Sequence, residues 1–345
     1  MRRWVKVSVT AAVVLSVGGW FAQPYVKDWW LVRDACDGGL PAGAARELAP
    51  HDAHFAGEES RTLRGLGEYR CEVTVEGDDE PTQLVSLRAY TGRDAVEGSL
   101  LTSVRSGFQR MAAVPEGLPG FVSRYKTADF LVPCPDLPKD ADGRSPKMLA
   151  HFTFGEKTLT GRPAVYEAAV ALVNSASDRL GCGAAPLKAP TGKDGLPDPE
   201  DEQDPVWLDE AGDTGCAWAR KAGLPSAPAA WRVVDRMNDA APIGRCAFQN
   251  RAPGDDEPGA PLAFESWYGD WTDRLLTEGL SHARWLTATA RCDGEAAHFV
   301  LSADDEFPGL GTAKQRALLK AFAEDKVERR GCTDLRMDGA EAQSG

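Results

Sequence analysis

Two histidines stand in the same short context in the two halves of the chain, and their side chains are suited to acid–base chemistry. One tripeptide is Ala150-His151-Phe152 and the other is Ala297-His298-Phe299. An imidazole titrates near neutral pH, which suits proton transfer or pH sensing. Neither histidine has a nucleophile or a carboxylate motif beside it in the sequence. Because a duplication would also repeat the tripeptide, we interpret both histidines as structural.

Two further patterns suggest chemistry only in part. Ser123 and Lys126 have the spacing of a serine nucleophile and its lysine base in penicillin-interacting enzymes, but the partner motifs S-D-N and K-T-G do not follow. His51 and His54 flank a carboxylate, whereas a zinc site needs three or four ligands. We interpret the first pattern as a coincidence of spacing and the second as a solvated loop.

The string Gly-Asp-Asp-Glu-Pro occurs at residues 77–81 and again at 254–258. Its carboxylates are ligands that calcium prefers, but the spacing is not that of an EF-hand loop. A hairpin tip needs polar turn residues in any case. The familiar fingerprints of serine hydrolases, zinc proteases and nucleotide-binding loops are absent from the chain. We therefore expect no catalytic residue, no metal site and no cofactor.

Tryptophans gather in the second half of the chain, and residues 31–206 contain none. Exposed indoles would form a platform for a glycan or a protein partner, whereas buried indoles would fill the core. The most compact group is the candidate partner-binding cluster of Trp267, Tyr268 and Trp271. Core packing is the simpler interpretation, and the sequence leaves both open.

The N-terminus has the pattern of a membrane anchor. Three basic residues lie within the first six positions, and residues 7–22 carry no charge. Basic residues before an apolar segment place the N-terminus in the cytoplasm and the remainder outside it. Tyr25, Trp29 and Trp30 then resemble an aromatic belt at the outer interface. We expect residues 1–32 to be a signal anchor with a juxtamembrane segment, so that the protein is a single-pass protein of the cell membrane with its C-terminal domains extracytoplasmic.

Cleavage as a signal peptide is the alternative to this anchor, although Trp20 and Phe21 fit a cleavage site poorly. Cys36 lacks the preceding residues of a lipoprotein signal. The formal net charge of −13 over 345 residues disfavours nucleic-acid binding, which depends on basic surfaces.

Eight cysteines in an exported chain predict four disulfides, since the compartment beyond the membrane is oxidising. Four cysteines in each half allow three connectivities, and the sequence does not choose among them. We favour neighbours in order, because each such bond would tie a flanking segment or a closing helix to a strand. The favoured pairs are Cys36 with Cys71, Cys134 with Cys182, Cys216 with Cys246, and Cys292 with Cys332.

The cysteine spacing and the repeated strings indicate a duplication. The features occur in the same order in both halves, and each half closes on a Gly-Cys pair, at 181–182 and at 331–332. The expected domains are an α+β unit at 33–182, an acidic Pro-rich linker at 183–215, a second α+β unit at 216–332 and a disordered tail at 333–345.

Within the first unit, period-two alternation predicts strands at 72–75 and 85–89, joined as a hairpin by residues 77–81. A helix is predicted to open at Asp94, with Leu101, Val104, Phe108 and Met111 on one face. A strand at 152–154 and a closing helix at 164–180 follow, the helix burying Val165, Ala169, Leu172 and Ala176. The fold class is therefore α+β, with two tandem disulfide-tied units of antiparallel sheet and flanking helices after an N-terminal transmembrane helix.

The segments from Cys36 to Cys71 and from Cys216 to Cys246 resemble disulfide-paired cell-envelope proteins of actinobacteria with a PsbP-like α+β fold. In both segments a cysteine precedes a helix start rich in small residues and leucine, and a second cysteine opens a strand. The resemblance implies an envelope location and binding of a ligand or partner, and it transfers no catalytic residue.

These features predict a membrane-anchored, extracytoplasmic binding or assembly module of the bacterial cell envelope that is not an enzyme. Its expected contacts are the membrane, through the N-terminal helix, and an envelope protein or glycan. The alternative is an exported hydrolase or cell-wall-modifying enzyme with an unrecognised site.

Overall fold

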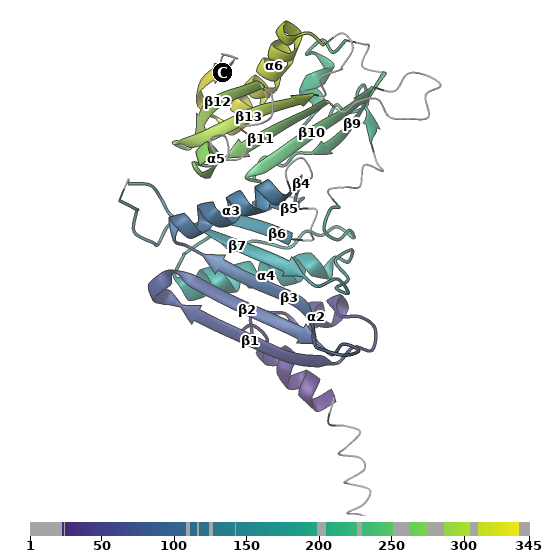
Figure 1. The fold of residues 1–345 in the computed structure, drawn as a ribbon, viewed down its shortest axis with the longest axis vertical. Coiled ribbons are helices and arrows are strands. Elements are labelled where there is room, and N and C mark those ends of the chain that lie inside the picture. The colour runs from purple at the N-terminus through teal and green to yellow at the C-terminus, as the bar shows by residue number, and fades with distance from the viewer. Residues whose placement is uncertain are drawn as a thin grey trace, which may run out of the picture. The chain divides into compact units, whose positions relative to one another are not determined.

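A computed structural model describes residues 23, 25–107, 111–115, 117–123, 127–141, 143–198, 205–225, 230–250, 262–274, 286–303 and 310–337. The chain forms two antiparallel seven-stranded sheets with flanking helices, which confirms the α+β class (Figure 1). The uncharged segment 7–22 lies outside the described residues. Among the residues that are described, no helix has the length and apolar character needed to cross a bilayer.

The first sheet has the strand order β1-β2-β3-β7-β6-β5-β4. Its strands are β1 (Phe55–Leu63), β2 (Glu68–Val75), β3 (Thr82–Tyr90), β4 (Met111–Ala113), β5 (Gly120–Ser123), β6 (Thr127–Pro133) and β7 (Lys147–Phe154). A short 3-10 turn, η1 (Arg64–Leu66), joins β1 to β2. The helices of this half are α2 (Ala42–Leu48), α3 (Arg93–Gly107) and α4 (Ala164–Leu180), and α4 lies against β2 and β3 (Figure 1).

The second sheet has the order β14-β12-β13-β11-β10-β9-β8. Its strands are β8 (Val206–Trp207), β9 (Trp231–Arg236), β10 (Ile243–Asn250), β11 (Leu262–Tyr268), β12 (Leu286–Cys292), β13 (Glu295–Ala303) and β14 (Thr333–Met337). The helical segments are η2 (Ala217–Arg220), α5 (Trp271–Arg274) and α6 (Thr312–Arg330). Helix α6 covers one face of this sheet, where Phe264, Phe299 and Phe322 meet in the core.

Five of the seven strands follow the same order in the two sheets. The neighbouring strands are β1-β2-β3-β7-β6 in the first sheet and β9-β10-β11-β13-β12 in the second. In both series the first three strands are consecutive in the chain, and the last two lie in the sheet in the reverse of their chain order. Each series is followed by a long helix that ends at a glycine in the left-handed conformation, Gly181 with φ 66° and Gly331 with φ 64°. A helix commonly ends in this way because glycine adopts positive φ without steric cost. This correspondence supports the duplication inferred from the sequence.

The disulfides join the cysteines in the predicted order. The Cα atoms of Cys36 and Cys71 are 5.2 Å apart, and those of Cys216 and Cys246 are 5.7 Å apart. The other two bonds fasten the ends of α4 and α6 to the segments that follow β6 and end β12, with Cα atoms 4.3 and 4.2 Å apart. No cysteine in the chain is free.

Several predicted elements are confirmed. The predicted hairpin is formed by β2 and β3, which pair antiparallel across residues 77–81. Helix α4 spans 164–180 as predicted. It buries the predicted stripe of Val165, Ala169, Leu172 and Ala176.

The prediction for the first long helix was wrong at its end. Met111 is not on the face of α3, because it begins β4 and pairs with Ser123 of β5. Phe108 lies outside the described residues, whereas Leu101 and Val104 are buried on α3 as expected.

Part of the predicted linker 183–215 and part of the predicted tail 333–345 are ordered. Leu208 and Ala211 are buried, and β8 pairs with β9, because an apolar stretch follows the acidic residues of the linker. Residues 333–337 form β14 on the edge of β12, where the Cys292–Cys332 bond holds them and Leu335 packs on the core. Residues 338–345 lie outside the described part of the chain.

By its internal contacts the chain divides into two compact units, one of residues 1–90, 134–137 and 152–195 and one of residues 91–133, 138–151 and 196–345. The division passes through the first sheet, so the domain boundaries expected at 33–182 and 216–332 stay a prediction.

Candidate functional site

The predicted platform of Trp267, Tyr268 and Trp271 is not a surface. Their exposed fractions are 0%, 8% and 4%. Trp267 and Tyr268 are consecutive on β11 and so point to opposite faces of the sheet, and both side chains are buried. The indole nitrogen of Trp271 donates a hydrogen bond to the carbonyl of Tyr268 at 3.0 Å. These residues belong to the core, which agrees with the simpler of the two interpretations of the cluster and not with an exposed platform.

The two repeated histidines each contact an aspartate that local sequence does not reveal. His151 Nδ1 lies 2.7 Å from Asp129 Oδ1 of β6, and His298 Nε2 lies 2.8 Å from Asp273 Oδ1 of α5. Asp129 stands 22 residues before His151, and Asp273 stands 25 residues before His298. This similar spacing is the one feature of the sequence that links each aspartate to its histidine. The two pairs use different ring nitrogens and different elements, so the duplication has not preserved one catalytic geometry.

The remaining local motifs do not come together into a site. Ser123 ends β5, its hydroxyl lies 2.5 Å from that of Thr127, and Lys126 is outside the described residues. His51 contacts the exposed Asp52 next to it, whereas His54 contacts Asp28. The string at 77–81 forms the turn before β3, and its copy at 254–258 lies outside the described residues.

A patch of apolar side chains does reach the surface on the helical segment 25–34. We call it the N-terminal aromatic surface; it consists of Tyr25, Val26, Trp29 and Trp30, which are 69%, 53%, 46% and 53% exposed. The two indoles meet edge to face at 5.0 Å. The guanidinium of Arg33 lies 5.1 Å from the Trp29 ring and 5.9 Å from the Trp30 ring, within the range of a cation–π contact.

The same helical segment is fixed to the first sheet through its polar side chains. One carboxylate oxygen of Asp28 accepts a hydrogen bond from the backbone N–H of Phe55 at 2.8 Å, and the other lies 2.7 Å from His54 Nδ1. Lys27 pairs with Glu76 at 3.4 Å. The hydrogen bond to Asp28 raises the pKa of His54. The aromatic surface is therefore attached to β1 by named contacts.

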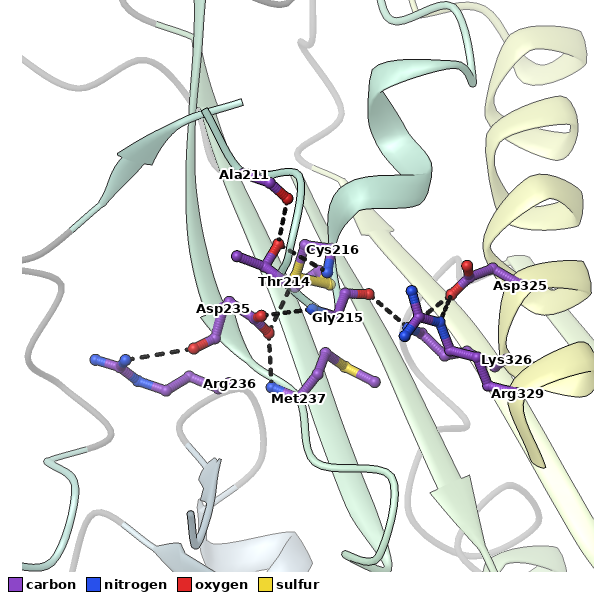
Figure 2. Close-up of a disulfide and its surroundings, with 11 residues drawn as sticks. Ala211, Thr214, Gly215, Cys216, Asp235, Arg236, Met237, Asp325, Lys326 and Arg329 are labelled. Atoms are coloured by element: carbon purple, nitrogen blue, oxygen red, sulfur yellow. Dashed lines mark hydrogen bonds and ion pairs between the residues drawn. A yellow bond between two sulfur atoms is a disulfide. The ribbon is translucent and has the colours of Figure 1, made fainter. Parts of the chain in front are cut away.

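A second cluster surrounds the Cys216–Cys246 disulfide (Figure 2). Asp235 of β9 accepts hydrogen bonds from the backbone N–H groups of Gly215, at 2.7 Å, and Met237, at 2.9 Å. Lys326 of α6 donates a hydrogen bond to the carbonyl of Gly215 at 2.5 Å and pairs with Asp325 at 2.9 Å. Gly215 is thus held through its N–H and its C=O by two oppositely charged side chains, an arrangement that we call the Gly215 clamp.

Burial perturbs both charged groups of the clamp. It raises the pKa of Asp235 and lowers the pKa of Lys326, because a low-dielectric environment disfavours the charged forms. Paired perturbations of this kind occur at functional sites and also in structural networks. Lys326 and Cys216 have no exposed surface, so no substrate reaches them in this conformation.

Comparison of the two halves identifies the clamp as specific to the second. Asp235 lies opposite Cys246, and its counterpart opposite Cys71 is Ser60. Lys326 stands six residues before Cys332, and Ala176 stands six residues before Cys182. The acid and the base are therefore present together in one half and absent together from the other, as expected for a compensated pair.

The clamp also contains a group of donor atoms that a metal could use. The donor atoms of Cys216, Asp235 and Cys246 lie within 4.8 Å of one another, and they form the one such group among the residues described. Both sulfurs are consumed in the disulfide, so the thiolates that a metal ion requires do not exist in this state. The arrangement fits a structural role.

The second half also carries a surface groove of about 240 Å³. Its lining residues come from β12, α6 and β14: Leu286, Thr287, Arg316, Ala317, Leu319, Lys320 and Met337. The sequence patterns gave no indication of it.

The chain was compared with protein-family models, curated proteins and solved structures, and none of them matches it. The likeness to PsbP-like envelope proteins therefore stays an expectation from the sequence.

Proposed function

We propose that this protein is a membrane-anchored, extracytoplasmic binding or assembly module of the bacterial cell envelope and that it is not an enzyme. The observation that carries the proposal is the N-terminal aromatic surface. It follows directly after the uncharged segment 7–22 in the sequence. Tryptophan and tyrosine prefer the interface of a bilayer, where their rings contact both lipid and water.

The distribution of exposed apolar side chains supports this assignment. Among the described residues, the large exposed hydrophobic side chains other than Leu66 and Val206 all fall within positions 25–30. A soluble surface rarely concentrates such residues without a contact that covers them. Lys27 and Arg33 on the same segment complete the composition expected near lipid headgroups.

The four disulfides support export, because paired cysteines persist in oxidising compartments. The contacts of Asp28 with His54 and Phe55 would hold the first sheet beside the bilayer instead of on a flexible tether. A fixed position close to the membrane suits a module that assembles with other envelope components.

The proposal is tested by reconstituting the full chain into vesicles whose lipids carry bromine near the headgroup, which quenches nearby indoles. We expect the chain to float with the vesicles and its fluorescence to be quenched. Trp4 and Trp20 of the proposed anchor would be quenched as well, so the comparison is made in a chain that carries Trp4→Phe and Trp20→Phe. In that chain Trp29→Phe with Trp30→Phe should remove most of the quenched signal, whereas Trp207→Phe, the matched control in the second half, should leave it unchanged. A chain that sediments without the vesicles, or equal quenching of the double variant, would contradict the proposal.

The histidine–aspartate pairs favour a second candidate, an exported hydrolase or cell-wall-modifying enzyme. A carboxylate that orients an imidazole supplies two of the three parts of a hydrolytic triad. Turnover of peptidoglycan fragments or of generic esters by the full chain, abolished by His151→Ala or His298→Ala, would replace the binding-module proposal with this one.

A further inference from the structure

We propose that the groove between α6, β12 and β14 binds a single-chain anionic amphiphile, with its acyl chain in the groove and its carboxylate at the mouth. This inference rests on the proposed function, because a module at the membrane surface meets such molecules. It adds a binding site and a ligand class to that function.

The floor of the groove is apolar. Leu286 of β12, Leu319 of α6 and Met337 of β14 line it, and each also packs with the core of the second sheet. The core below therefore fixes the shape of the groove. A volume of about 240 Å³ accommodates about eight groups of the size of a water molecule or a methylene, which corresponds to a medium-length acyl chain.

Two basic side chains, Arg316 and Lys320, line the groove and are exposed, so they form its solvent-facing mouth. Arg316 and Lys320 are four residues apart on α6 and so lie on the same helix face. Lys320 also contacts Glu324, while Arg316 has no ion-pair partner among the residues described. Two cations at an apolar groove contrast with the formal net charge of −13, and they select an anionic head group over a neutral or cationic one. A guanidinium suits a carboxylate because it donates two parallel hydrogen bonds.

The test uses the full oxidised chain in vesicles and a decanoate that carries a diazirine in mid-chain. Irradiation cross-links the probe to the residues around it, and peptide mass spectrometry locates the adduct. We expect labelling of peptides that contain Leu286, Leu319 or Met337, and competition by decanoate but not by decyltrimethylammonium.

Reversal of the charge at the mouth, Arg316→Glu with Lys320→Glu, should reduce labelling at least about tenfold, since a charge-assisted hydrogen bond exceeds the free energy of a tenfold change in affinity. Lys314→Glu is the matched control, because Lys314 lies on the same helix and is not among the residues that line the groove. Adducts outside the groove, equal labelling of the charge-reversed chain, or equal competition by the cationic amphiphile would overturn the inference.

The two proposals fail in different ways. Trp29→Phe with Trp30→Phe should alter the membrane contact and leave labelling of the groove intact. The charge reversal on α6 should abolish labelling and leave flotation with vesicles intact. A wild-type chain that floats with the vesicles but is not labelled in the groove would refute the groove proposal and leave the membrane proposal standing.

Discussion

Replacing Asp235 with alanine tests whether the Gly215 clamp stabilises the second half of the chain. The carboxylate accepts the N–H groups of Gly215 and Met237. Alanine leaves both half-buried donors without an acceptor, and each lost bond costs about 1 kcal/mol. We therefore expect Asp235→Ala to lower the free energy of unfolding by about 2 kcal/mol, and Asp235→Asn, which retains one acceptor, by about half as much.

Urea unfolding followed by tryptophan fluorescence measures this change, because Trp218, Trp231 and Trp267 are buried in the second half. Ser60→Ala is the matched control at the equivalent position opposite Cys71, because Ser60 has no carboxylate to lose. It should change the free energy of unfolding by less than about 0.5 kcal/mol.

The pH dependence gives a second readout. Burial raises the pKa of Asp235 above its unfolded value, so the folded state binds more protons between the two values. The contribution of Asp235 to stability is therefore greatest at acidic pH and falls as pH rises through the raised pKa. Asp235→Asn should remove that fall. A loss below about 0.5 kcal/mol in Asp235→Ala, or an equal loss in Ser60→Ala, would refute the clamp.

Three further predictions concern single contacts. Burial lowers the pKa of Lys326, so below pH 10.5 the unfolded chain binds more protons than the folded chain and wild-type stability rises with pH. Lys326→Met should remove this rise, and urea titrations at several alkaline pH values measure it. Gly215→Ala should destabilise the chain by about 1–3 kcal/mol in thermal unfolding, since the added Cβ would lie 2.4 Å from Cβ of Met237; an unchanged Tm would refute the close approach. His54→Ala should abolish the pH dependence of amide exchange protection in residues 25–34 that comes from the contact of His54 with Asp28. In the wild type, the raised pKa of His54 makes its contact with Asp28 stabilising at acidic pH and weaker as pH rises through that pKa, and protection that does not change in this way would contradict the attachment.

The periodicity of apolar residues was sufficient to predict individual strands and helices. Period-two alternation predicted the hairpin of β2 and β3, and helical periodicity predicted α4 with its buried stripe. The cysteine order predicted all four disulfides, because each bond closes one element onto its neighbour.

Exposure and long-range contacts required the tertiary structure. The cluster around Trp267 looked available in sequence, but its burial depends on what packs on the two faces of the sheet, which local sequence does not show. The Gly215 clamp joins residues 111 positions apart, and no local motif marks it. Its one sequence signal is the joint replacement of Ser60 and Ala176 in one half by Asp235 and Lys326 in the other, which becomes readable only once the strands are aligned.

Cross-linking of the full-length chain in its native membrane, followed by affinity purification and mass spectrometry, tests the binding-module proposal most directly. The account predicts one envelope component recovered in stoichiometric amount, with cross-links to the extracytoplasmic residues. Recovery of the chain alone, or with cytoplasmic proteins, would contradict it.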